Sequence, residues 1–131
     1  MRNYLVNRCR SLIFSTAIAP VNAAWSRYVV SRIPYMTRER ERLARIAGEV
    51  ARATGSEASH IQPVIVGDSA RALEMSRQLL ERGVKVLPIR TPTVPPGTER
   101  LRVSLSASLT DSDVETIVKA FEALSPTVVN P

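Results

Sequence analysis

The hydrophobic pattern of the chain changes at Ile61, and this change limits the possible folds more than any other feature of the sequence. From Ile61 to Val66 the residues are mostly apolar and β-branched, and Gly67 ends the run, which is typical of a buried strand. The preceding stretch places apolar residues at the three- and four-residue spacing of an amphipathic helix: Leu43, Ile46, Ala47 and Val50. A helical pattern that is followed by strands predicts a domain of mixed α and β structure.

Proline, glycine and capping residues set the bounds of the first two predicted helices. Pro20 suits the first turn of a helix over 20–31, because its missing N–H has no partner to lose there, and Pro34 stops this helix. The next helix is rich in arginine. Its N-cap is Thr37, and Gly55 is a natural C-terminal stop.

Two further helices are predicted in the C-terminal half. Asp68 or Ser69 can cap the first, which Gly83 ends. Thr110 can cap the second, where Asp111 and Asp113 lie favourably at the positive end of the helix dipole. The inner stripes that we expect are Leu73, Ser76, Leu79 and Leu80 in the first helix, and Val114, Ile117, Val118, Phe121 and Leu124 in the second.

Two more strands complete the predicted fold, Val84 to Ile89 and Leu101 to Leu105, and a short extended segment over 12–14 opens the chain. The order helix, helix, strand, helix, strand, strand, helix favours a two-layer α/β unit. In it, a three-stranded sheet carries helices on one face and is preceded by two helices. We expect a first segment over 1–36, the α/β domain over 37–125 and a tail over 126–131.

The sequence is basic, with a net charge of +6, and its only lysines are Lys85 and Lys119. Such a balance favours an anionic partner, either nucleic acid or a phosphorylated ligand. However, the arginines between Arg38 and Arg52 alternate with glutamates, which is typical of a solvated helix face with pairs four residues apart. We therefore expect a solvated face here and no nucleic-acid partner.

Single residues and short runs exclude several other classes of protein. Cys9 is the only cysteine, which rules out a disulfide within the chain and favours a reducing, cytoplasmic compartment. The apolar run from Leu12 to Ala19 is far shorter than the roughly 18 residues of a membrane span, so no membrane association is expected. His60 has no neighbour at metal-ligand spacing, so no metal site is predicted.

The proline-rich loop Arg90–Thr98 is the principal candidate for chemistry. Three prolines and a glycine stiffen it, so it can hold a side chain in place at little entropic cost. Arg90 can bind a carboxylate through two parallel hydrogen bonds, and Thr93 can donate a hydroxyl hydrogen bond to a substrate. The alternative is a rigid connection with a solvated arginine, which composition alone favours. Ser15 and Thr16 precede a helix start and can bind phosphate, although ordinary capping by Thr16 is the simpler interpretation.

Three segments resemble the α-oxoamine synthases, a family of pyridoxal-phosphate-dependent enzymes. Residues 59–68, SHIQPVIVGD, are similar to the family strand S-x-I-Q-P-I-I-V-G. Residues 86–105, VLPIRTPTVPPGTERLRVSL, resemble its segment P-I-R-P-P-T-V-P-x-G-T-x-R-L-R-I-S-L. Residues 14–17 and Pro20 are similar to its turn F-S-T-A-L-P-P. Within the family, the form of the proline-rich loop looks most like that of the 8-amino-7-oxononanoate synthases.

The resemblance implies the small C-terminal domain of the aspartate-aminotransferase fold type, with residues 1–36 attached to a large cofactor domain. It implies a homodimeric enzyme that uses pyridoxal phosphate to condense L-alanine with an acyl-CoA, pimeloyl-CoA, in biotin synthesis. By the same resemblance, Arg90 binds the amino-acid or product carboxylate and Thr93 binds substrate. Ser15 and Thr16 fall on a turn that reaches the cofactor phosphate of the partner subunit.

The sequence also departs from this family. Lys85 lies at a predicted strand start and Lys119 on the outer side of the last helix, so neither takes the place of the Schiff-base lysine. The family's ring-stacking histidine and ring-nitrogen aspartate are absent too, and Ala19 and Thr91 replace family residues. We therefore expect a chain that is inactive without a large cofactor domain or a separately encoded N-terminal half. It can be half of a split enzyme, a truncation or a mis-called start. The alternatives are a basic non-enzymatic binding module and a non-functional remnant.

Overall fold

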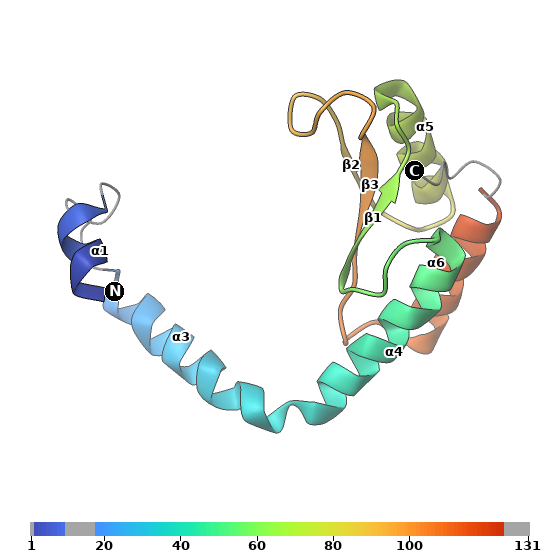
Figure 1. Cartoon of the computed structure of the whole chain (residues 1–131). Helices are drawn as coiled ribbons and strands as arrows, with labels where there is room; N and C mark the ends of the chain where they lie inside the picture. The colour runs from blue at the N-terminus through green and yellow to red at the C-terminus, as the bar shows by residue number, and fades with distance from the viewer. Residues whose placement is uncertain (1, 10–17, 125–131) are drawn as a thin grey trace. The chain divides into compact units, whose positions relative to one another are not determined.

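The computed structural model describes residues 2–9 and 18–124, and the chain divides into two compact units, Met1–Thr37 and Arg38–Pro131 (Figure 1). The first unit contains α1 (Arg2–Arg8), α3 (Pro20–Arg32) and a 3-10 turn, η1 (Ile33–Tyr35). The second unit is built from α4 (Thr37–Thr54), β1 (Ile61–Ile65), α5 (Ser69–Glu81), β2 (Leu87–Ile89), β3 (Arg100–Ser104) and α6 (Asp111–Glu122).

The three strands form an antiparallel sheet in the order β1–β3–β2. The central strand is β3, because Leu101 pairs both with Val64 of β1 and with Pro88 of β2. Along β3, Leu101 and Val103 are buried, whereas Arg102 between them is exposed. This two-residue alternation gives the sheet one buried face and one open face.

The helices α4, α5 and α6 lie on the buried side of the sheet (Figure 1). Their buried apolar residues form one cluster with those of the strands, since apolar surface is stabilised by its removal from water. The largest fully buried apolar side chains in it are Ile46, Val50, Val64, Leu79 and Leu101. The structure thus confirms the predicted two-layer α/β unit with helices on one face of a three-stranded sheet.

The predicted caps of the last two helices are also confirmed. Asp68, rather than Ser69, caps α5, because its carboxylate accepts a hydrogen bond of 2.8 Å from the backbone N–H of Arg71. Thr110 caps α6 and forms a capping box with Asp113. The pKa of the Asp113 carboxyl lies below its ordinary value, chiefly because the hydroxyl of Thr110 donates a hydrogen bond to it. The backbone N–H of Thr110 donates a second one, whose effect is smaller.

The expected inner stripe of α5 is wrong in part. The buried residues of this helix are Ala72, Met75 and Leu79, whereas Leu73 and Leu80 are exposed. Each residue turns roughly 100° around the helix axis, so a stripe in phase with Ala72 leaves Leu73 and Leu80 outside it. Ser76 lies where it was expected, near the core, and its hydroxyl donates to the carbonyl oxygen of Val86 over 3.0 Å.

The strand β2 begins at Leu87 rather than at Val84, because the preceding residues close the end of α5. The N–H groups of Gly83 and Val84 donate to the carbonyl oxygens of Leu80 and Leu79, each over 2.9 Å. This pattern is a Schellman ending, and Gly83 adopts the φ of +82° that it requires.

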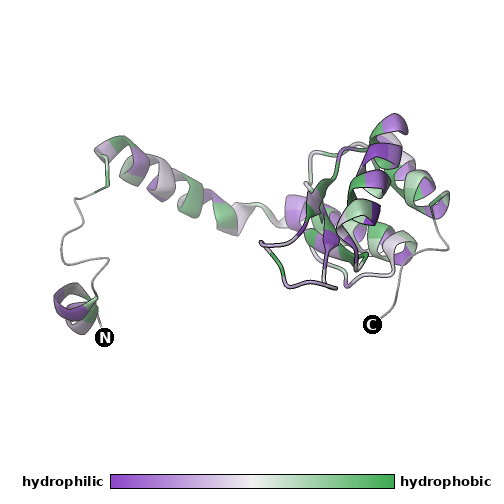
Figure 2. Ribbon diagram, turned by 90° about the horizontal axis from the view of Figure 1, so that it is seen from above, coloured by the Kyte–Doolittle hydropathy of each residue, from purple (hydrophilic) through white to green (hydrophobic). Residues whose placement is uncertain are grey.

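The helix α3 of the first unit buries none of its residues. Its exposed side chains include Trp25 and Tyr28, whose ring centroids are 5.7 Å apart, and hydrophobic residues recur along it (Figure 2). The α-helix ends at Arg32, close to the predicted end, and Pro34 lies in the 3-10 turn that follows. Among the described helices, none is long and apolar enough to cross a membrane. The predicted extended segment over 12–14 and the tail over 126–131 lie outside the described residues.

Candidate functional site

The proline-rich loop over 90–99 connects β2 to β3, so the sheet fixes both of its ends. Ile89 pairs with Arg100 across these strands, and Arg90 therefore begins the loop at the rim of the sheet. Ile65 of β1 pairs with the same Arg100. As a result, the connection from β1 to α5 starts at this rim as well.

A tight turn brings together the two predicted substrate-binding residues, Arg90 and Thr93. The backbone N–H of Thr93 donates to the carbonyl oxygen of Arg90 over 2.9 Å, and that of Val94 lies 3.4 Å from the same oxygen. The peptide bond between Thr91 and Pro92, inside this turn, is cis. Arg90 and Thr93 thus occupy the first and last positions of one four-residue turn.

Both of these side chains are exposed. Within the part of the chain that the structure describes, neither the guanidinium of Arg90 nor the hydroxyl of Thr93 has a hydrogen-bond or ion-pair partner. A guanidinium offers five N–H donors in a planar fork, and a hydroxyl offers one O–H donor. The turn therefore presents donors that suit a carboxylate, and the role of the two residues in binding stays a prediction.

A second turn, Pro95–Thr98, closes the loop. The N–H and the hydroxyl of Thr98 both donate to the carbonyl oxygen of Pro95, over 3.1 and 2.7 Å. Gly97 has a φ of +81°, a conformation that other residues adopt only with strain. The carbonyl oxygen of Gly97 lies 3.6 Å from where a Cβ would stand on Gly67. The second turn thus rests against the connection from β1 to α5.

A buried carboxylate at the base of the loop, that of Glu99, was not predicted as a site residue. Glu99 is 5% exposed, and its Oε1 accepts hydrogen bonds from the hydroxyls of Thr91 (2.9 Å) and Ser69 (3.4 Å). Its Oε2 is buried and has no partner among the described residues. The pKa of this carboxyl is lowered, chiefly by a hydrogen bond from the backbone N–H of Glu99 itself and next by the hydrogen bond from the Thr91 hydroxyl. Burial acts in the opposite direction but is the smaller effect. The two-residue period of β3 is the signal that identifies it, because Glu99 shares the phase of Leu101 and Val103.

The other predicted residues lie elsewhere. Ser15 and Thr16 are outside the described residues. Lys119 is exposed on α6 and its Nζ donates to Glu115 over 2.6 Å, which raises the pKa of the lysine. Lys85 is exposed and precedes β2, at the opposite end of that strand from the loop. In the described ranges, no three His, Cys, Asp or Glu side chains are grouped so that they can hold a metal ion.

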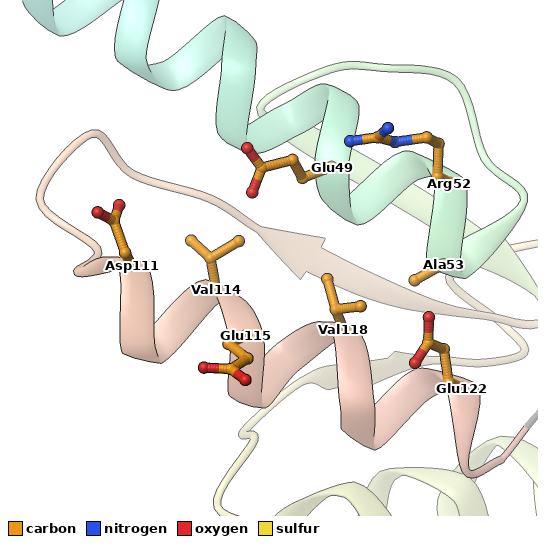
Figure 3. Close-up of a pocket in the computed structure, with 8 residues that line it drawn as sticks. All are labelled: Glu49, Arg52, Ala53, Asp111, Val114, Glu115, Val118 and Glu122. Atoms are coloured by element: carbon orange, nitrogen blue, oxygen red, sulfur yellow. The ribbon is translucent and has the colours of Figure 1, made fainter.

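A groove of about 500 Å³ runs between α4 and α6 (Figure 3). Val114 and Val118 point from α6 toward α4, and Ala53 faces them from α4 (Figure 3). Acidic side chains, including Glu49 and Glu122, line it as well. No residue of the 90–99 loop lines this groove, so the groove and the predicted site are separate features.

The arginine-rich helix α4 uses Arg42 to hold the turn before α6. The Nη2 of Arg42 donates to the carbonyl oxygen of Leu109 (2.7 Å) and to Asp111 (3.0 Å), and its Nε donates to the carbonyl oxygen of Ala107 (3.2 Å). Arg45 also lies 3.7 Å from Asp111. These contacts occupy part of the basic face that a nucleic-acid-binding module would need.

Comparisons with known sequences match most of the chain. The family model "Aminotransferase class I and II" matches residues 1–121. The 8-amino-7-oxononanoate synthase of Haemophilus ducreyi is 40% identical over 125 residues, which are 90% of this chain and 32% of that protein. A putative 8-amino-7-oxononanoate synthase of Pasteurella multocida is 37% identical over 132 residues, 95% of this chain and 34% of that protein. The chain therefore spans about a third of the length of the curated relatives that it matches.

Solved structures of larger enzymes share the fold. The serine palmitoyltransferase of S. paucimobilis, with a bound pyridoxal phosphate–myriocin aldimine, matches with a TM-score of 0.80 at 27% identity. That match covers 96% of this chain and 34% of the enzyme. The 8-amino-7-oxononanoate synthase of Francisella tularensis matches with a TM-score of 0.71 at 20% identity, over 94% of this chain and 38% of that one.

Proposed function

The chain belongs to the aminotransferase class I and II family, with the fold of the small C-terminal domain of its pyridoxal-phosphate enzymes, and on this premise we propose that it is the C-terminal part of an 8-amino-7-oxononanoate synthase. The reaction is the condensation of L-alanine with pimeloyl-CoA, which releases CO₂ and CoA during biotin synthesis. One observation carries the proposal: an exposed Arg90–Thr93 turn lies within a chain that is 40% identical to the synthase of Haemophilus ducreyi.

In this proposal, the Arg90–Thr93 turn binds the substrate. The guanidinium of Arg90 binds the amino-acid or product carboxylate through two parallel, charge-assisted hydrogen bonds. The hydroxyl of Thr93 donates a further hydrogen bond to the same ligand. Because the two residues begin and end one turn, held by the 2.9 Å hydrogen bond from the Thr93 N–H to the Arg90 carbonyl oxygen, a single small ligand can contact both.

Pyridoxal phosphate supplies an electron sink for this chemistry when it is bound. Its attachment needs a lysine amine beside the substrate, and the described residues do not offer one. Lys119 is paired with Glu115 on an exposed helix face, and Lys85 lies at the far end of β2 from the loop. The described residues therefore fit the substrate carboxylate and do not fit the cofactor. We assign the cofactor and its lysine to the part that corresponds to the other two-thirds of the relatives' length.

The same proposal assigns the segments of the chain and their partners. Residues 1–36 pack against the cofactor domain, residues 37–125 form the small domain, and 126–131 are a tail. Ser15 and Thr16 contact the cofactor phosphate across a homodimer, and the assembled enzyme works in the cytoplasm. Support comes from α3, which buries none of its residues and exposes Trp25 and Tyr28. Large exposed apolar surface on a helix is typical of a contact with another polypeptide.

Growth without biotin tests the proposed function. The chain is co-expressed with the first two-thirds of the Haemophilus ducreyi synthase, in a bacterium that lacks its own 8-amino-7-oxononanoate synthase. We expect growth only when both polypeptides are present, and intact synthase serves as the positive control. If intact synthase restores growth and the soluble pair does not, the proposed function is wrong. Tight, salt-dependent binding of the purified chain to DNA would instead support the basic binding module.

A further inference from the structure

The buried Glu99 joins three segments at the rim of the sheet. Its carbonyl oxygen accepts hydrogen bonds from the backbone N–H groups of Val66 (2.8 Å) and Gly67 (2.9 Å), just after β1. Its carboxylate accepts hydrogen bonds from the hydroxyl of Ser69, the first residue of α5, and from that of Thr91 in the loop. One residue thus connects the end of β1, the start of α5 and the start of the loop.

Thr91 links this carboxylate to the predicted site. It is the second residue of the Arg90–Thr93 turn and is exposed, whereas the carboxylate to which it donates is buried. The hydrogen bond between them is 2.9 Å long and joins residues eight positions apart, at the two ends of the loop. An exposed turn is thereby attached to a fixed point in the protein interior.

Stability alone does not favour a hydrogen-bond-accepting side chain at this buried position. A buried carboxylate is costly unless its oxygens are paired, and the Oε2 of Glu99 has no partner among the described residues. Residues that leave a buried polar atom without a hydrogen-bond partner tend to belong to functional sites. The hydrogen bonds that the carboxylate accepts from Thr91 and Ser69 contribute to lowering its pKa, which agrees with a group that accepts from both hydroxyls.

We propose that Glu99 is a positioning residue that acts through Thr91 to hold the Arg90–Thr93 turn in the geometry in which both side chains contact one substrate. The inference rests on the proposed function, because it takes Arg90 and Thr93 as substrate contacts. The role needs a hydrogen-bond acceptor at Oε1. Glutamine supplies that acceptor and alanine does not.

Matched variants separate the hydrogen bond from the bulk of the side chain. Thr91→Val removes the hydroxyl at nearly constant shape, and Thr91→Ser keeps it. Glu99→Ala removes the acceptor, and Glu99→Gln keeps it. Ser69→Ala removes the longer contact to the same oxygen, 3.4 Å, without altering the loop. If Glu99→Ala does not fold, the two Thr91 variants still decide the question.

The first measurement is amide hydrogen exchange in the full chain. We expect Thr91→Val and Glu99→Ala to raise the exchange rate of the Thr93 N–H roughly three- to tenfold. A change of this size corresponds to the loss of the stabilisation that one hydrogen bond provides. The Leu105 N–H, which donates to the carbonyl oxygen of His60 over 2.8 Å, should exchange at its wild-type rate. Thr91→Ser, Glu99→Gln and Ser69→Ala should all resemble the wild type.

The second measurement uses the chain mixed with the first two-thirds of the Haemophilus ducreyi synthase, called the cofactor portion from here on. We expect the KM for L-alanine to rise by a similar factor in Thr91→Val, with little change in kcat, and to return in Thr91→Ser. Unchanged exchange at Thr93 would overturn the positioning role whatever the activity. Faster exchange with an unchanged KM in an active mixture would overturn it too. Faster exchange with no activity in any mixture would support the positioning of the turn and reject the proposed function.

Discussion

The buried amide of Gln62 connects the helical layer to the sheet. Its Nε2 donates to the carbonyl oxygens of Ala47 (2.8 Å) and Ser59 (3.1 Å), and its Oε1 accepts from the hydroxyl of Ser56 (3.0 Å), with the hydroxyl of Thr54 at 3.2 Å. Both N–H donors and the carbonyl oxygen of the amide are therefore used, and a satisfied buried polar group specifies one packing arrangement.

Replacing this amide should destabilise the domain. In Gln62→Leu, the carbonyl oxygen of Ala47 and the hydroxyl of Ser56 lose their shared partner in a buried site, so we expect the free energy of unfolding to fall by about 1–3 kcal/mol. Urea denaturation of the full chain measures this change. Ser104→Ala, at an exposed position of β3, is the control and should differ little from the wild type. A Gln62→Leu variant as stable as the wild type would contradict this account of the amide.

Arg90→Ala should impair substrate binding far more than folding. The side chain is exposed and has no partner among the described residues, so the melting temperature of the chain should not change. In a mixture with the cofactor portion, the KM for L-alanine should rise roughly tenfold or more, as expected for hydrogen bonds to a charged group. Arg82→Ala is the matched control, since the Arg82 side chain is exposed and, among the described residues, donates to the carbonyl oxygen of Gln78 over 2.9 Å. A fall in melting temperature that accounts for the lost activity would contradict a binding role.

The residues of the site differed in how far the sequence could predict them. Arg90 and Thr93 stand in a segment whose resemblance to a family marked both, and their proximity follows from a turn of four consecutive residues. Glu99 was missed because its partners Thr91 and Ser69 lie 8 and 30 positions away, and only the folded sheet brings them together. Gln62 was likewise treated as part of an apolar run, since its partner on α4 is 15 residues distant.

At the scale of the elements, the helix ends and the inner faces of α4 and α6 were predicted well, whereas the inner face of α5 was predicted only in part. A cap depends on residues within one turn, and the predicted cap by Thr110 formed, with Asp113 completing a capping box. The buried face of α5 depends instead on how the helix rests on the sheet. Ala72 and Met75 therefore occupy the core positions that had been expected for Leu73 and Leu80.

The capping box should contribute to stability in a pH-dependent way. The pKa of Asp113 is lowered in the folded chain, first by the Thr110 hydroxyl, so its contribution is present above the unfolded pKa of about 3.9 and is lost as the pH falls through the folded pKa. Asp113→Asn should therefore melt at a lower temperature than the wild type at pH 7, and this difference should shrink as the pH falls below about 4. Thermal melts followed by circular dichroism measure it. If the melting temperatures of Asp113→Asn and the wild type differ by the same amount at pH 7 and below about pH 4, the charge of the carboxylate is not involved.

At the scale of the whole molecule, the second unit has its own core, whereas the predicted site is an open turn that lacks the groups of a complete active site. The chain spans about a third of the relatives' length, and its helix α3 buries none of its own residues. Both observations fit a polypeptide that supplies substrate-binding residues to an enzyme whose cofactor is held elsewhere. We therefore expect two polypeptides to complement each other in forming the active enzyme.

A titration tests this claim most directly. The purified chain is added in increasing amounts to a fixed amount of the cofactor portion of the Haemophilus ducreyi synthase, with pyridoxal phosphate and pimeloyl-CoA, and the release of CoA is followed. We expect CoA release that requires L-alanine and saturates at one chain per cofactor portion. No L-alanine-dependent release at any ratio, under conditions in which the intact synthase is active, would contradict it.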